Sequence, residues 1–149
     1  MTLRPAEPAD VDAMAAAHAS AFDEAWSAGD LLVMMTDRGA IALVVEAAPG
    51  ALSGFILCRV IAGEAEIVTL AVRPQHRRRG VARALLAAAE AAARLTAEAM
   101  FLEVAVDNAG AIALYEQAGY APVGRRAGYY ARPGGASADA IVMRRTLNS

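Results

Sequence analysis

One carboxylate interrupts an apolar stretch in the C-terminal half of the chain. Glu103 is the only charged residue between Met100 and Val106, and this composition is typical of a strand that is covered on both faces. Burying a carboxylate is costly unless it is paired or solvated. Burial also makes a carboxylate a stronger proton acceptor, as a general base must be. Two interpretations stay open: Glu103 is a catalytic base, or it lies at the open end of the strand and pairs with an arginine.

A second segment has the composition of an anion site. Residues 77–82 place a glycine between an expected strand and the start of an expected helix, where backbone N–H groups and the helix dipole attract negative charge. The alternatives are a solvated arginine cluster and a nucleic-acid patch. The lysine and the Ser/Thr magnesium ligand of a nucleoside-triphosphate loop are missing, and the dinucleotide fingerprint does not match. The segment reads Arg77, Arg78, Arg79, Gly80, Val81, Ala82.

The remaining sequence predicts the elements that position these residues. Asp10 is expected to cap a helix that runs to Phe22, and Gly119 is expected to end another helix as a left-handed cap. A long helix should open at Gly80 and pack one face against the core, through Val81, Leu85, Ala88, Ala92 and Leu95. Further helices are expected at residues 27–35 and 108–118, and strands at residues 2–4, 40–46, 54–60, 65–72, 100–106, 120–125 and 138–145.

This order of elements predicts an α/β (α+β) fold. One mixed sheet of about seven strands should carry about four helices, within a single domain that covers residues 1–149. The apolar fraction of 57% and the charged fraction of 20% are those of a globular domain. Cys58 alternates with core residues and is expected to be a buried, inert thiol.

Composition and charge also limit the partners and the location. The net charge of −2 argues against general nucleic-acid binding, although all 14 basic residues are arginines that can bind phosphate. His18 and His76 lack metal-ligand spacing, so no metal is expected. The N-terminus does not resemble a signal peptide, and residues 81–95 are too short and too charged to span a bilayer. A cytoplasmic monomer or weak dimer without membrane contact is expected.

Together these segments resemble the GNAT superfamily of acetyl-CoA-dependent N-acetyltransferases. Residues 77–82 match its cofactor motif, with Ala82 where glycine is more frequent, and the second signature is matched by Asn108, Ala111, Leu114, Tyr115, Gly119 and Tyr120. Within the superfamily the chain is similar to the bacterial ribosomal-protein-alanine N-acetyltransferases. The matching stretches are residues 26–27, 102–104, 108–116, 125–126, 129–130 and 139–143.

The resemblance implies roles for the donor side of the reaction. Acetyl-CoA would be the cosubstrate, and residues 77–82 would bind its pyrophosphate. Backbone groups of Leu70, Ala71 and Val72 would hold the pantetheine arm, and one amide would polarise the thioester carbonyl. Asn108 would contact the cofactor or cap the helix that carries Tyr115. Tyr115 would protonate the leaving thiolate, with core packing as the alternative reading of this side chain.

The resemblance also implies an acceptor, the N-terminal alanine of a small-subunit ribosomal protein. An α-amino group has a pKa of about 7.7–8.0 against about 10.4 for lysine, so a modest base suffices. Glu103 would be that base, acting through a water molecule, and Glu66 is the rival. Trp26, Tyr129 and Tyr130 would contact the peptide, the two tyrosines from a loop between the last strands. The alternatives are a GNAT enzyme for another amine and a non-catalytic acyl-CoA sensor.

Overall fold

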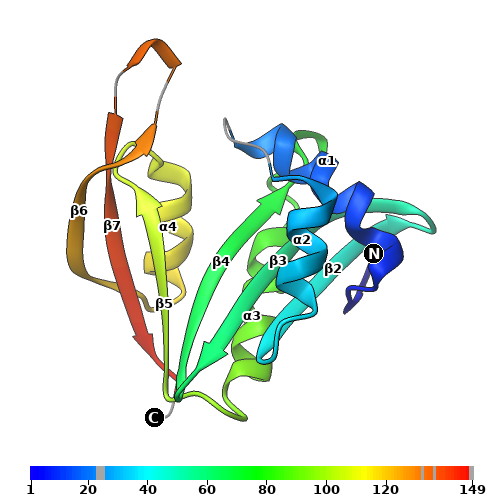
Figure 1. Ribbon diagram of the computed structural model, residues 1–149, viewed down its shortest axis with the longest axis horizontal. Helices are drawn as coiled ribbons and strands as arrows, with labels where there is room; N and C mark the ends of the chain where they lie inside the picture. Colours follow the sequence, from blue (N-terminus) through cyan, green and yellow to red (C-terminus); the bar gives the residue numbers. More distant parts are fainter. Residues whose placement is uncertain (23–25, 132, 136, 148–149) are drawn as a thin grey trace.

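The computed structural model describes residues 1–22, 26–131, 133–135 and 137–147, which form a mixed sheet with helices on both faces. The strand order is β1-β2-β3-β4-β5-β7-β6. The expected α+β architecture, with seven strands and four α-helices in the described residues, is confirmed (Figure 1). The elements are β1 Thr2–Pro5, α1 Val11–Ala21, α2 Ala28–Met35, β2 Ala40–Ala48, β3 Ala51–Ile61, β4 Glu64–Val72, α3 Val81–Ala93, β5 Ala99–Ala105, α4 Ala109–Gln117, β6 Ala121–Ala131 and β7 Ser137–Thr146. Short 3₁₀ turns lie at Pro8–Asp10, Pro74–His76 and Pro133–Gly135.

The sheet opens in its middle, between β4 and β5. These parallel strands pair over three residues only, Glu64–Glu66 with Ala99–Phe101. Beyond this point they diverge, and Figure 1 shows the widening gap between them. A bulge at Val68 marks the same region, because Cys58 pairs with Ile67 whereas Leu57 pairs with Thr69. A bulge bends its strand and increases the local twist, so β4 turns away from β5.

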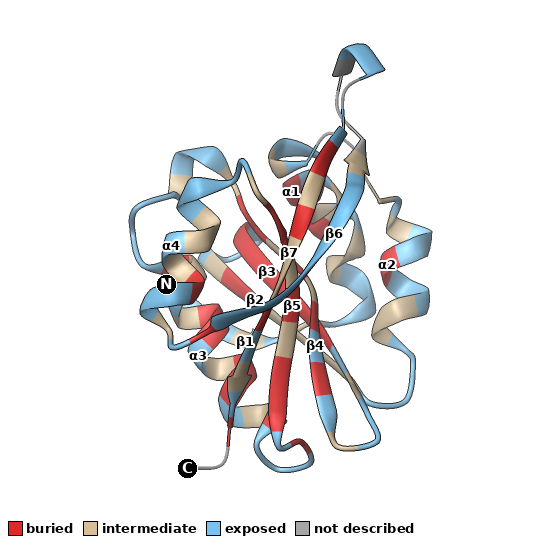
Figure 2. Cartoon of the chain, turned by 90° about the vertical axis from the view of Figure 1, so that its left-hand side faces the viewer, coloured by how far each residue is buried: buried red, intermediate tan, exposed pale blue. Residues whose placement is uncertain are grey.

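Two apolar clusters cover the two faces of the sheet. The alternation of side chains along a strand sends Ile56 and Cys58 of β3 into the cluster beneath α3 and α4, and Phe55 and Leu57 into the cluster beneath α1 and α2. Cys58 is buried as a free thiol, as expected. Figure 2 shows buried residues concentrated on the central strands, whereas β6 is largely exposed.

Gly54 allows β3 and β4 to approach each other closely. A Cβ at this position would lie 2.6 Å from the carbonyl oxygen of Ala71 and 3.2 Å from the Cα of Val72. Both are backbone atoms, which cannot easily move aside. A glycine in β3 therefore sets the position of the end of β4, where the expected pantetheine-binding segment lies.

Three expectations about the elements are wrong. The Asp10 carboxylate does not cap α1; it accepts hydrogen bonds from the Glu7 N–H and the Arg4 guanidinium, because a 3₁₀ turn precedes the helix. Leu95 is 85% exposed, since α3 ends at Ala93 and Ala97 fills the core instead. Strand β6 continues to Ala131, so the two tyrosines at 129 and 130 lie on a strand rather than in a loop.

Local contacts define the ends of two helices, and the left-handed end expected at Gly119 is confirmed. Ser27 caps α2, because its hydroxyl accepts the Asp30 N–H at 3.1 Å. Gly119 ends α4 with φ of 96°, and the N–H of Tyr120 donates to the carbonyl oxygen of Tyr115 in the closing turn. In the part of the chain that the structure describes, no helix is both long enough and apolar enough to cross a bilayer.

Candidate active site

A cleft of about 790 Å³ fills the space where β4 and β5 separate. Its walls come from α1, β4, β5, α4 and the end of β6, so they join segments that lie far apart in the sequence. Most of the side chains predicted to act on the substrates share this cleft: Trp26, Glu66, Leu70, Glu103, Asn108, Tyr115, Tyr129 and Tyr130. The arginine-rich segment does not line the cleft and lies beyond the end of β4.

Glu103 lies on β5 between the buried side chains of Leu102 and Val104. Its Oε1 is 3.4 Å from Nε of Arg126, and its side chain is 27% exposed. Oε2 is buried and has no hydrogen-bond partner among the described residues. The carboxylate therefore pairs with an arginine, as one interpretation of the sequence expected, and it also lines the cleft, whereas its role as a base stays a prediction.

The two tyrosines at the end of β6 lie next to Glu103. The Tyr130 hydroxyl donates to the backbone oxygen of Glu103 at 3.0 Å. The Tyr129 ring lies under the Arg126 guanidinium, 5.2 Å from its centroid, and packs edge-on against Tyr130. Burial, and then the negative charge of Glu103, raise the pKa of Tyr129. These contacts bring the β6 aromatics to Glu103, which the sequence did not indicate.

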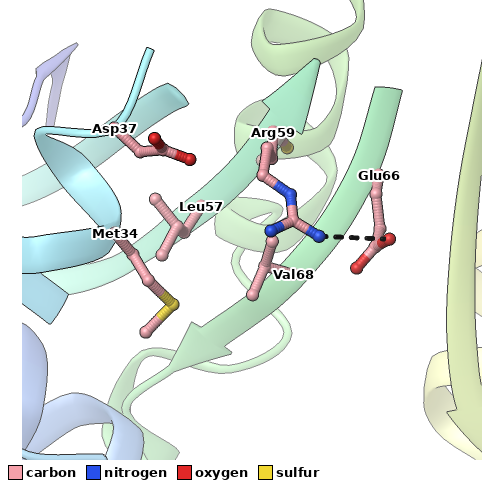
Figure 3. A pocket seen from close by; sticks show the side chains of 7 residues that line it. Met34, Asp37, Leu57, Arg59, Glu66 and Val68 are labelled. Atoms are coloured by element: carbon pink, nitrogen blue, oxygen red, sulfur yellow. Dashed lines mark ion pairs between the residues drawn. The ribbon is translucent and has the colours of Figure 1, made fainter. Parts of the chain in front are cut away.

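Glu66, the rival base, lies on β4 across the cleft. Its side chain is 55% exposed and is 3.9 Å from the Arg59 guanidinium. Glu66 also borders a smaller pocket of about 80 Å³ between α2 and strands β3 and β4. Figure 3 shows Arg59 reaching toward Glu66, with Met34 nearby. Glu66 is thus more exposed than Glu103, and its nearby cation is Arg59.

Tyr115 lies on the cleft-facing side of α4 and is 7% exposed. Its ring packs edge-on against Tyr120, with 5.7 Å between centroids. Burial raises the pKa of Tyr115 above its usual value of 10. The phenol therefore stays protonated at neutral pH and can donate a hydrogen bond into the cleft. The core-packing and catalytic readings of Tyr115 are compatible, since one side of the residue is packed and another lines the cleft.

Asn108 begins the helix that carries Tyr115. Its Oδ1 accepts the Ala111 N–H at 3.1 Å, so Asn108 caps α4, one of its two expected roles. It also lines the cleft. A cap of this kind stabilises a helix by about 1 kcal/mol and fixes where the helix begins.

The segment before α3 has the geometry of an anion site. Gly80 adopts φ of 78°, and no other heavy atom lies within 4 Å of a Cβ placed there, so a ligand can approach the backbone. The first N–H groups of an α-helix lack partners within the helix. Three exposed arginines, Arg77 to Arg79, precede them, and Nε of Arg77 donates to the carbonyl oxygen of Val72 at 3.2 Å. This bond joins the cationic segment to the end of β4.

The edge of β4 connects this anion site to the cleft. From Ile67 to Val72 the strand pairs with β3 on one side, and β5 has moved away on the other. Leu70 lines the cleft, whereas the side chains of Ala71 and Val72 are buried in the core. Only backbone groups of Ala71 and Val72 are therefore available to a ligand, which fits an amide-containing arm beside a strand edge.

The site includes a residue that the sequence analysis left without a role. His18 on α1 is 3% exposed and stacks between Phe22 and Trp26, with both ring centroids 4.6 Å away. All three residues line the cleft. The aromatic spacing at positions 18, 22 and 26 follows one face of a helix, and this pattern was the available signal.

Comparisons with known proteins agree with this geometry. The ribosomal protein bS18-alanine N-acetyltransferase of Escherichia coli (strain K12) is 36% identical over 95 residues, which are 63% of this chain and 64% of that protein. A putative enzyme of the same name from Bacillus subtilis (strain 168) is 28% identical over 140 residues, 93% of this chain and 91% of that protein. The match spans only 21% of the length of a Mycobacterium leprae (strain TN) relative, which is 45% identical over 82 residues, and 64% of the Escherichia coli enzyme.

The fold comparison covers nearly the whole chain. The crystal structure of the ribosomal-protein-S18-alanine N-acetyltransferase from Escherichia coli superposes with a TM-score of 0.90 at 28% identity. The superposition covers 99% of this chain and 94% of that one. The sequence model of the Acetyltransferase (GNAT) family matches residues 11–120, which include α1, the divergent strands, the arginine-rich segment and Tyr115. This chain therefore belongs to the GNAT family of acetyltransferases.

Proposed function

We propose that this protein transfers the acetyl group of acetyl-CoA to the N-terminal alanine of a small-subunit ribosomal protein. The observation that carries the proposal is the cleft between β4 and β5, which brings Glu103 and Tyr115 to one site. The names of the Escherichia coli and Bacillus subtilis relatives support the acceptor.

The donor would bind along β4 and at the start of α3. Arg77 to Arg79 and the free N–H groups after Gly80 supply charge and hydrogen bonds for a pyrophosphate. Backbone groups of residues 70–72 would hold the pantetheine arm, and an N–H of this edge would polarise the thioester carbonyl. This arrangement would place the reactive end of the donor in the cleft, between the two proposed acid–base residues.

Glu103 would take a proton from the acceptor amine through a water molecule, with Glu66 as the less favoured base. The neutral amine forms a C–N bond to the carbonyl carbon, the nitrogen gives up its second proton to solvent water, and the C–S bond breaks as the carbonyl re-forms. The thiolate that leaves would receive a hydrogen bond from Tyr115, the residue that the family resemblance casts as its proton donor. Because burial raises the pKa of Tyr115 above that of a thiol, about 8.5, complete proton transfer runs uphill. Tyr115 would therefore act chiefly by stabilising the thiolate through its hydrogen bond.

The acceptor would enter between the aromatic groups at the two sides of the cleft. Trp26 lines it from the segment before α2, and Tyr129 and Tyr130 line it from β6. An α-amino group carries less proton affinity than lysine, so a partly solvated carboxylate such as Glu103 is a sufficient base. The lower pKa of an α-amino group favours an N-terminal acceptor over a lysine side chain.

A turnover assay tests the proposal. The purified protein is incubated with acetyl-CoA and the N-terminal hexapeptide of the ribosomal protein, and release of free thiol is followed. The same peptide with a blocked N-terminus is the matched control and should give no thiol. Turnover on small amines with none on the peptide would reject the acceptor. Acetyl-CoA binding without turnover on any amine would reject catalysis.

A further inference from the structure

A buried histidine joins two helices at the acceptor side of the cleft. His18 lies near the end of α1, and its ring is sandwiched between Phe22 and Trp26 at interplanar angles of 26° and 16°. Phe55 of β3 closes the stack from the sheet, 6.5 Å away. The imidazole is therefore fixed on three sides by aromatic rings.

The same imidazole also holds the backbone of Trp26. Nδ1 of His18 accepts the Trp26 N–H at 3.2 Å. A nitrogen that accepts a hydrogen bond carries no proton, so this contact requires the tautomer protonated on Nε2. The neighbouring residue, Ser27, is the cap of α2, so His18 connects the end of α1 to the start of α2. Burial lowers the pKa of His18, which favours the neutral ring that the contact needs.

We propose that His18 is a positioning residue that holds Trp26 against the cleft and so sets the affinity for a peptide acceptor. The inference rests on the proposed function for its acceptor. His18 supplies two separable contacts, a ring that stacks on the indole and a nitrogen that fixes the Trp26 backbone. The proposed donor groups lie on β4, α3 and α4, so loss of His18 should affect the acceptor and leave the donor unchanged.

Two substitutions separate the two contacts. His18→Asn keeps an acceptor oxygen close to the position of Nδ1 and loses the ring. His18→Phe keeps a ring and loses the acceptor, which leaves the Trp26 N–H unpaired. Loss of one hydrogen bond corresponds to about a 5- to 10-fold weakening, so the KM for the peptide should rise by about this factor in His18→Phe. His18→Asn should recover part of this loss, and the KM for acetyl-CoA should stay unchanged in both.

Trp26 is the only tryptophan of the chain, so its fluorescence reports on the stack directly. The ring loss in His18→Asn and the lost backbone contact in His18→Phe should each increase quenching of Trp26 by acrylamide in the free protein. His76→Asn is the matched control, because His76 lies in the turn after β4 and should leave quenching and peptide KM as in the wild type. Near-UV circular dichroism verifies that each variant is folded.

The outcomes distinguish this inference from the proposed function. If the His18 variants change the quenching of Trp26 but the protein turns over no peptide, His18 still positions Trp26, but the proposed role of Trp26 in peptide affinity is rejected. Wild-type quenching and wild-type peptide KM in both His18 variants would overturn the inference. An equal rise in KM for peptide and for acetyl-CoA would also overturn it, because the effect would then be general damage to the fold.

Discussion

Replacing Glu90 by alanine should cause a large and specific loss of stability. Glu90 lies on α3 and is 5% exposed. Its Oε2 accepts the Tyr120 hydroxyl at 2.9 Å and is paired with Nη1 of Arg145, also at 2.9 Å. One buried carboxylate thus joins α3 to the residue that precedes β6 and to β7. Alanine would leave both partners without their acceptor.

The size of the effect follows from these contacts. Breaking a buried ion pair by removing one partner costs about 3–5 kcal/mol, because a charge is left buried and unpaired. The Arg145 side chain is 30% exposed and can regain water, so the lower end applies and the expected loss is about 3 kcal/mol. For 149 residues the unfolding entropy is about 0.3 kcal/mol per degree, so the expected fall in Tm is about 10 °C.

Urea and thermal unfolding measure this loss. Glu90→Gln should cost about 1–2 kcal/mol, because an amide oxygen still accepts the Tyr120 hydroxyl while the charge is lost. Glu116→Ala is the control, since it removes an exposed carboxylate of a helix and should change stability by about 0.5 kcal/mol or less. A Glu90→Ala variant as stable as Glu116→Ala would refute the reasoning, because the buried pair would then contribute nothing.

Three further predictions concern the site and its supports. Glu103→Gln and Tyr115→Phe should each lower turnover by about 10²–10⁴-fold in the thiol-release assay while leaving the urea midpoint close to wild type; wild-type rates in both would remove the proposed acid–base pair. Gly54→Ala should destabilise by about 1–3 kcal/mol in urea unfolding, because the new Cβ meets the Ala71 carbonyl oxygen at 2.6 Å, and an unchanged midpoint would contradict this. Burial lowers the pKa of His18, so the unfolded chain binds a proton more readily below about pH 6.5, and stability falls as the pH falls. The unfolding free energies at about pH 7.5 and about pH 5 should therefore differ more for the wild type than for His18→Phe, and equal differences would argue against a neutral buried imidazole.

Most elements of the fold could be predicted from local patterns. The apolar run around Glu103 predicted a central strand, and the Asn108 cap and the Gly119 terminator marked the two ends of α4 correctly. These features depend on neighbours within a few residues, which the sequence displays directly. The same local reasoning failed at Leu95, because the core was filled by Ala97 from beyond the end of the helix.

The site was predicted in part. The residues expected to act on the substrates were placed in one cleft, and the anion segment was placed at the start of α3. The extension of β6 beyond residue 125 was missed, because its pairing with β7 resumes at Tyr130 after an irregularity that no local pattern announces. His18 was also missed, because the spacing of His18, Phe22 and Trp26 was not recognised as a stack, and the helix itself ends at Ala21, before two of the three rings.

The sequence by itself determined which chemical groups this protein has: an isolated carboxylate in an apolar strand, a tyrosine on a short capped helix, and an arginine-glycine segment before a long helix. These are properties of residue type and spacing. The tertiary structure alone decided that they serve one cleft. A three-residue pairing of β4 with β5, followed by a bulge at Val68, separates the strands and opens the space between them. Such a separation depends on contacts between residues more than 30 positions apart in the chain, and no local pattern encodes it.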